Sequence, residues 1–228
     1  MKLVISLGGS LITKNFTAEK IKSYAKALQT ISTTADKLVV VAGGGKLSRN
    51  YIEIIKDIGI DQEHQDKIAI QATHLNARMI AMALNHTEQG IANSTIPKTE
   101  KDIETMLNKH KILVCGGTIP GQSTDNVSAK IAKNIKADLL INASNIDGVY
   151  DSDPNKNKNA KKHETLTYNE LIEIVSKNEQ SPGKYALFDK QAAQIIKDQK
   201  IKTIIINGND SGELIKATNG THSGTTIQ

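Results

Sequence analysis

The 228-residue sequence has few of the residues that mark several common protein classes. Cys115 is the only cysteine, so no disulfide can form within the chain and a disulfide-stapled scaffold is excluded. No apolar run approaches the ~18 residues of a membrane-spanning helix. The N-terminus is a short apolar run followed by glycines, which differs from a secretory signal. We therefore expect a cytoplasmic protein without a membrane partner.

Aromatic residues and arginine are also scarce. The chain has no Trp, two Phe and five Tyr, which leaves few rings for stacking on nucleic-acid bases. The formal net charge of +5 comes from an excess of lysine, because Arg49 and Arg78 are the only arginines. A modest lysine excess is more typical of a soluble surface than of a nucleic-acid interface. We expect no nucleic-acid partner; RNA binding stays an alternative that rests on charge alone.

Short apolar runs alternate with amphipathic stretches along the chain. The apolar runs cover residues 3–7, 37–42, 112–115, 138–143 and 202–206. Continuous apolar runs that end at glycine or a small polar residue are typical of strands buried on both faces of a mainly parallel sheet. Helical periodicity recurs at 21–31, 47–58, 68–83, 127–135, 171–175 and 192–196. This alternation predicts an α/β fold, a three-layer sandwich with a mainly parallel central sheet and helices on both faces.

The length fits one domain over residues 1–228. No internal repeat or break in composition indicates a second domain. The polar segment 151–164 is predicted to be a loop. Cys115 is expected to be a buried residue at a strand end.

Three glycine-rich turns follow three of the predicted strands. They are Gly8-Gly9-Ser10, Gly43-Gly44-Gly45 and Gly116-Gly117-Thr118. Ligands of open parallel sheets bind at the carboxyl ends of the strands, and free N–H groups at helix starts suit phosphate. The spacings GxGxxG and GxxxxGK[ST] are absent, which excludes a dinucleotide fingerprint and a P-loop. The turns therefore predict a different kind of phosphate site.

Two further residues belong to this hypothesis. Arg49 lies four residues after Gly45, about one helical turn, and so is expected to point at the same phosphates. Asp147 follows the fourth predicted strand, where an acid can orient lysines or metal around a phosphoryl group or can simply form a turn. Tyr150 either offers a flat face to a purine or packs in the core.

The motifs together resemble a known family. The sequence contains GGGKLSRNYI at 43–52, GGTIPGQSTDN at 116–126, NIDGVYDSDP at 145–154 and SGTTI at 223–227. Their order and spacing resemble the amino acid kinase superfamily, and within it the archaeal type of uridylate (UMP) kinase. The resemblance implies reversible transfer of the ATP γ-phosphoryl group to UMP with Mg²⁺, giving UDP and ADP, in pyrimidine nucleotide (CTP) biosynthesis. It also implies a homohexamer built as a trimer of dimers.

The resemblance also implies roles for individual residues. The expected ATP contacts are Gly9, Ser10, Gly45, Arg49, Ser144, Tyr150 and Asp153. The expected UMP contacts are Gly44, Asp66, Thr118, Ile119, Pro120, Gly121, Gln122, Ser123 and Thr124. Asp147 would organise the catalytic centre. Because Ser6 stands where many superfamily members have lysine, the neutralising lysine is sought elsewhere, with Lys14 and Lys184 preferred over Lys46. His74 stands where close relatives often have arginine.

Two alternatives stay open. One is another kinase of the superfamily, acting on isopentenyl phosphate or N-acetylglutamate, although the segment 118–124 favours a nucleotide acceptor. The other is a nucleotide-binding module without catalysis, which only Ser6 supports.

Overall fold

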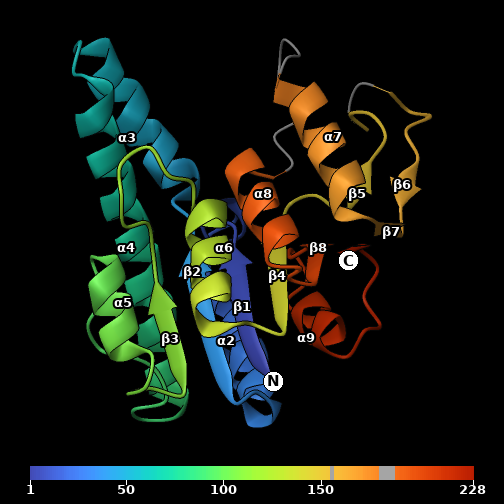
Figure 1. Cartoon of the computed structure of the whole chain (residues 1–228). Coiled ribbons are helices and arrows are strands. Elements are labelled where there is room, and N and C mark those ends of the chain that lie inside the picture. The colour runs from blue at the N-terminus through green and yellow to red at the C-terminus, as the bar shows by residue number, and fades with distance from the viewer. Residues whose placement is uncertain (155–156, 180–187) are drawn as a thin grey trace.

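A computed structural model of the chain describes residues 1–154, 157–179 and 188–228 (Figure 1). Within these residues, seven strands form the main sheet, in the order β3-β2-β1-β4-β8-β9-β7. The strands are β1 (Lys2–Leu7), β2 (Lys37–Ala42), β3 (Ile112–Cys115), β4 (Leu139–Ser144), β7 (Thr165–Leu166), β8 (Thr203–Asn207) and β9 (Thr225–Ile227). The first five in this order are parallel, whereas β9 runs antiparallel to β8.

Helices cover both faces of this sheet, as the sequence predicts. One layer contains α1 (Gly9–Thr13), α2 (Ala18–Thr34), α4 (Gln62–Thr87) and α9 (Gly212–Thr218). The other contains α5 (Glu100–Met106), α6 (Thr124–Ile135), α7 (Tyr168–Glu179) and α8 (Lys190–Asp198). The α/β sandwich with a mainly parallel central sheet is therefore confirmed. Among the described residues, no helix has the length and apolar character needed to cross a membrane.

Each of the five parallel strands β3, β2, β1, β4 and β8 contributes to two hydrophobic cores, which explains its continuous apolar sequence. On β1, Leu3, Ile5 and Leu7 join the core under α2 and α4, while Val4 joins the core under α6 and α8. Alternation along a strand sends successive side chains to opposite faces, and both faces are covered. Burial of apolar surface on both sides stabilises the sheet by about 25 cal/mol per Å².

Two buried polar residues interrupt the second face. Ser6 on β1 and Asn142 on β4 are neighbours in the parallel register, and both are almost fully buried. Buried polar groups need hydrogen-bond partners. Their partner is Asp125 on α6, to which both side chains donate.

Helix α3 (Gly45–Asp57) lies outside these layers and packs mainly on α4. Its apolar residues Tyr51 and Ile54 are exposed, as are its C-cap Ile58 and, on α4, Leu75 and Met82. The helical periodicity of both segments is therefore confirmed, but much of the apolar face of each does not enter the cores. The buried side of α4 is made of residues such as Asn76, Ala77, Ile80, Ala81 and Leu84.

The loop prediction for 151–164 is wrong at its end. Lys162–His163 form strand β6, which pairs antiparallel with β5 (Val149–Tyr150) in a second, two-stranded sheet. Tertiary contacts hold this pair in place: the Thr225 hydroxyl accepts a hydrogen bond from the Val149 N–H and donates to the His163 carbonyl. Such long-range contacts leave no local pattern in the sequence.

Candidate functional site

The carboxyl ends of β1, β2, β3, β4 and β8 lie at the same edge of the sheet, because these strands are parallel. Backbone hydrogen bonds continue between the chain segments that leave them. The Gly43 N–H donates to the Leu7 carbonyl at 2.9 Å, and the Gly8 N–H donates to the Ala143 carbonyl at 2.8 Å. The predicted glycine turns therefore meet at this edge.

The first two turns touch each other backbone to backbone. A Cβ atom on Gly9 would lie 2.1 Å from the Gly45 nitrogen and 2.5 Å from the Gly43 oxygen. Gly45 also has a φ of +64°, a conformation that side chains disfavour. The close approach of the two chain segments therefore requires glycine at these positions. Contact with a phosphate would be a second reason for glycine here.

Asn76 on α4 holds the triple-glycine turn in place, although no motif in the sequence points to this residue. Its Nδ2 donates to the Gly43 carbonyl at 2.7 Å and to the Gly44 carbonyl at 3.2 Å. The side chain is 1% exposed, so these bonds are protected from water. A buried amide of this kind rigidifies the backbone that it holds.

The residues expected to contact ATP phosphates gather around this contact. Arg49 on α3 donates from Nη2 to the Ser10 hydroxyl at 3.3 Å. The Thr13 hydroxyl donates to the Gly9 carbonyl at 2.9 Å and accepts the Lys46 N–H at 3.1 Å. Helix α3 begins at Gly45 and presents the positive end of its dipole to the same point.

A cavity of ≈560 Å³ opens next to the triple-glycine turn. This volume is in the range of small-molecule sites. Its lining includes the predicted acceptor-site residues Gly44, Asp66, Ile119, Gly121, Gln122, Ser123 and Thr124. It also includes Gly117 of the third glycine turn, and Ser48, Gln62, Ala69, Ile70 and Thr73, which the sequence did not single out.

Helix α4 holds the third glycine turn at the cavity wall. The Thr73 hydroxyl accepts the Gly117 N–H at 2.8 Å, and His74 Nε2 lies 2.8 Å from the Gly117 carbonyl oxygen. A carbonyl oxygen only accepts, so Nε2 carries the proton. Burial lowers the pKa of His74, which favours the neutral ring. His74 therefore anchors the loop that begins at Gly117.

Thr118 is the next residue of this loop. Its Oγ1 is buried and has no hydrogen-bond partner within the described part of the chain. An unsatisfied buried hydroxyl costs about 1–3 kcal/mol. Both chain neighbours of Thr118, Gly117 and Ile119, line the cavity.

Asp125, the first-turn acid of α6, is a second residue to which the sequence assigned no role, although it ends the GGT…TD motif. Its Oδ1 accepts hydrogen bonds from the Ser6 hydroxyl at 2.9 Å and from Asn142 Nδ2 at 2.7 Å. Burial, with a smaller contribution from the nearby Asp189 carboxylate, raises the pKa of Asp125 to about 6 against the lowering effect of these hydrogen bonds. Ser6 thus contacts an acid inside the protein.

Asp189 connects this acid to the cavity. It caps α8 by accepting the Ala192 N–H at 2.9 Å, and its other oxygen accepts the Ser123 hydroxyl at 2.8 Å. Ser123 caps α6 and also lines the cavity. A polar network therefore runs from the sheet to the loop that closes the cavity.

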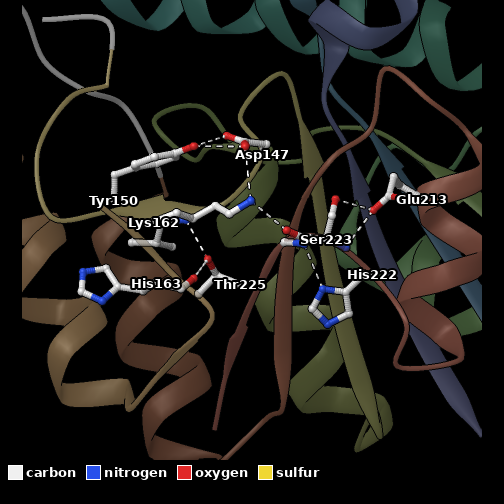
Figure 2. A network of polar contacts seen from close by, with 10 residues as sticks. Asp147, Tyr150, Lys162, His163, Glu213, His222, Ser223 and Thr225 are labelled. Carbon is white, nitrogen blue, oxygen red and sulfur yellow. Dashed lines mark hydrogen bonds and ion pairs between the residues drawn. The ribbon is translucent and has the colours of Figure 1, made fainter. Parts of the chain in front are cut away.

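Asp147 and Tyr150 lie beyond β4, where Figure 2 shows them in one hydrogen-bonded group. The Tyr150 hydroxyl donates to the two Asp147 carboxylate oxygens at 2.9 and 3.0 Å. Burial and the adjacent Asp147 raise the pKa of Tyr150, so the phenol stays protonated. Lys162 on β6 forms an ion pair with Asp147 at 3.4 Å.

The other residues predicted for the site lie on different segments and differ in burial. Ser144 ends β4, where its Oγ accepts the Ile146 N–H, and Asp153 is half-buried in the segment after β5. Pro120 is half-buried in the loop that contains the exposed residues Ile119 and Gly121. Lys14 is exposed directly after α1. Lys184 lies outside the described residues.

The fold and the site define a class: an α/β protein with glycine turns suited to phosphate at the carboxyl edge of its sheet, beside a cavity for a small molecule. The chain belongs to the amino acid kinase family, whose model matches residues 1–207.

Proteins of known name are similar to this chain over its whole length. It is 39% identical over 227 residues to the uridylate kinase of Methanobrevibacter smithii, covering 100% of this chain and 99% of the relative. The crystal structure of uridylate kinase from Archaeoglobus fulgidus superposes with a TM-score of 0.89 at 38% identity and covers 100% of both chains. The UMP kinase structure from Bacillus anthracis, with a TM-score of 0.83 at 22% identity, shares the fold; it covers 100% of this chain and 95% of that chain.

The contact between the glycine turns predicts the effect of adding one methyl group. We expect Gly9→Ala to lower the free energy of unfolding by about 1–3 kcal/mol, because the two turns must separate. Gly212→Ala, at the start of α9, is the matched control, since the three atoms nearest to a Cβ there all belong to the Asp210 side chain, at 3.1 Å or more. Urea unfolding measures both; equal stability of the two variants would contradict the close contact.

Asp125 predicts a pH dependence of stability. A carboxyl pKa raised in the folded state means that the folded protein binds more protons than the unfolded chain between about pH 4 and pH 6. This group therefore stabilises the fold at low pH, and its contribution falls by about 2–3 kcal/mol as the pH rises through that window.

The comparison of variants isolates this effect. Asp125→Asn cannot ionise, so the stability of the wild type relative to this variant should fall from pH 4 to pH 6 in urea titrations. Asp57→Asn on the exposed end of α3 should follow the wild-type curve. A constant difference between wild type and Asp125→Asn across this range would contradict the raised pKa.

Proposed function

We propose that the chain is a UMP kinase, which transfers the γ-phosphoryl group of ATP to the phosphate of UMP and gives ADP and UDP. The reaction is reversible and belongs to the synthesis of pyrimidine nucleotides leading to CTP. The observation that carries this proposal is the cavity beside the triple-glycine turn, lined by seven of the nine residues expected to contact UMP. Full-length similarity to uridylate kinases supports it.

The two nucleotides would meet across one turn. Gly44 lines the acceptor cavity, while Gly45 belongs to the Gly9 contact on the donor side. UMP in the cavity and ATP along Gly9, Ser10 and Arg49 would therefore bring the acceptor phosphate next to the γ-phosphate. Holding both reactants in line supplies much of the rate enhancement in phosphoryl transfer.

The chemical step needs little from the protein beyond position and charge. An oxygen of the UMP phosphate forms a bond to the γ-phosphorus, and the bond from that phosphorus to the bridging oxygen of ADP breaks. No proton has to move. The Arg49 guanidinium and the N–H groups at the start of α3 would face the charge on the transferred group, with Lys14 and Lys184 proposed as further cations.

Mg²⁺ fits this arrangement as a companion of ATP. The ion prefers phosphate oxygens and water and commonly takes only one or two protein carboxylates. The described residues contain no group of three His, Cys, Asp or Glu side chains that could hold a metal. A cation bound chiefly by the nucleotide suits that donor set, and it would neutralise charge on the phosphates.

Acceptor recognition would fall to α4 and the loop after β3. Asp66 lies at the cavity wall one helical turn from Gln62, which donates to it at 2.8 Å, and we assign it to the UMP ribose. The loop 118–124 would surround the phosphate and the uracil. Ser144, Tyr150 and Asp153 would contact the adenine nucleotide.

The same proposal includes an assembly. The exposed apolar residues of α3 and α4 support burial against other copies of the chain, in the homohexamer of paired subunits that the family resemblance implies. We further propose that residues 1–228 act as one domain in the cytoplasm, without nucleic-acid or membrane partners. Support for one domain comes from the main sheet, which contains both the first and the last strand.

An acceptor comparison tests the activity. ADP production from MgATP would be measured with UMP, CMP, isopentenyl phosphate and N-acetylglutamate. We expect kcat/KM for UMP to exceed the others by about tenfold or more, as expected where buried polar groups select the acceptor. Preference for another acceptor would contradict the proposal, and nucleotide binding without turnover would favour a non-catalytic module.

Thr118 provides a test of the acceptor cavity. Thr118→Val keeps the shape of the side chain and removes a hydroxyl that is unpaired in the protein alone. We expect the melting temperature without ligand to stay the same or rise. We expect the KM for UMP to rise about fivefold or more, because one hydrogen bond to UMP is lost. An unchanged KM for UMP would remove the Thr118 hydroxyl from the acceptor site.

A further inference from the structure

Lys162 is a cation at the donor side of the site that neither the motifs nor the family resemblance assigned. It lies on β6 directly opposite Tyr150 in the antiparallel register. Figure 2 shows its side chain directed toward Asp147 and Ser223. Only 30% of that side chain is exposed.

The alkyl stem of Lys162 packs on the glycine of the turn after β4. A Cβ on Gly148 would lie 2.9 Å from Lys162 Cδ and 2.7 Å from Thr225 Oγ1. Gly148 also has a φ of +148°, which side chains rarely adopt. The turn is therefore shaped to receive the lysine stem.

The ammonium group has two acceptors that other parts of the fold hold in place. Lys162 Nζ donates to the Ser223 carbonyl at 3.0 Å and lies 3.4 Å from Asp147 Oδ2. Glu213, which is 8% exposed, accepts hydrogen bonds from both the N–H and the hydroxyl of Ser223. The Ser223 carbonyl is thus a fixed anchor for the lysine.

Asp147 connects Lys162 to Tyr150. Its two oxygens accept the Tyr150 hydroxyl, while one of them also meets the ammonium group. The chain of contacts from Ser223 through Lys162 and Asp147 thus fixes the hydroxyl end of the Tyr150 ring. Lys162 also balances the charge of Asp147, which would otherwise repel an anionic nucleotide.

We propose that Lys162 is a positioning residue for the adenine nucleotide: anchored on the Ser223 carbonyl, it holds and neutralises Asp147, which orients the Tyr150 ring. This role depends on the proposed function in one respect, because it assumes that ATP binds next to Tyr150. Lys162 acts through Asp147 and Tyr150, and its loss affects ATP more than UMP.

Direct binding of MgATP in the absence of UMP tests this role. Isothermal titration calorimetry on Lys162→Met should show a Kd for MgATP raised about threefold to tenfold, the range for a partly exposed ion pair with a second hydrogen bond. Lys162→Arg should restore Kd to within about twofold of wild type. Lys161→Met, the exposed neighbour on the same chain segment, is the matched control and should leave Kd unchanged.

Steady-state kinetics and a double mutant separate positioning from a general structural effect. Lys162→Met should raise the KM for ATP and leave the KM for UMP within about twofold. In the Asp147→Asn background the same change should alter the Kd for MgATP by less than about twofold, because the two side chains act as a unit. Lys162→Gln, which keeps a donor for Ser223, serves if the Met variant does not fold.

Three results would overturn the proposal: an unchanged Kd for MgATP, an equal rise of both KM values, or the same effect of Lys162→Met with and without Asp147. The readouts keep this proposal separate from the assignment as a UMP kinase. A wild-type protein that binds MgATP but does not phosphorylate UMP would contradict the activity, while the calorimetric comparison of the Lys162 variants would still decide the role of the lysine.

Discussion

The backbone contact between Gly9 and the turn Gly43–Gly45 is the constraint on which the site depends. Two parallel strands end side by side, and their connections to α1 and α3 approach so closely that a single Cβ would force them apart. Asn76 holds one side of this contact from α4. The contact fixes the start of α3, and with it the position of Arg49 and the boundary between the proposed donor and acceptor sites.

Polar networks on either side of this contact have different characters. The network on the acceptor side is the more buried of the two: it joins Ser6, which is 3% exposed, to the partly buried Asp125, Asp189 and Ser123. The network on the donor side is half-exposed, and it joins Ser223, Lys162 and Asp147 to Tyr150. The buried network is sensitive to charge because the low dielectric strengthens each interaction, whereas water screens the exposed one. The proposed site is therefore positioned by rigid backbone near the reacting groups and by side-chain contacts farther from them.

Much of the fold could be predicted because local sequence and tertiary packing agree. The five parallel strands are apolar on both faces, so their sequence, their burial and the glycine or small polar residues at their ends all indicate the same elements. The strand β6 and the exposed faces of α3 and α4 were missed, since both depend on neighbours far along the chain. At the site, the motifs found the residues at the strand ends. They missed Asn76, Asp125 and Lys162, whose roles arise from contacts with other elements, between residues 33, 17 and 15 positions apart in the sequence. The sequence around a single polar residue does not show which distant residue its side chain will contact.

The most direct measurement of this account is a crystal structure with UMP and a non-hydrolysable ATP analogue bound together. We expect the UMP phosphate to lie in the cavity by Gly44 and the loop 118–124. We expect the γ-phosphate analogue to lie over the Gly9–Gly45 contact within reach of Arg49, with the two phosphates adjacent. Nucleotides bound elsewhere, or phosphates on opposite sides of α3 with no line of attack between them, would contradict it.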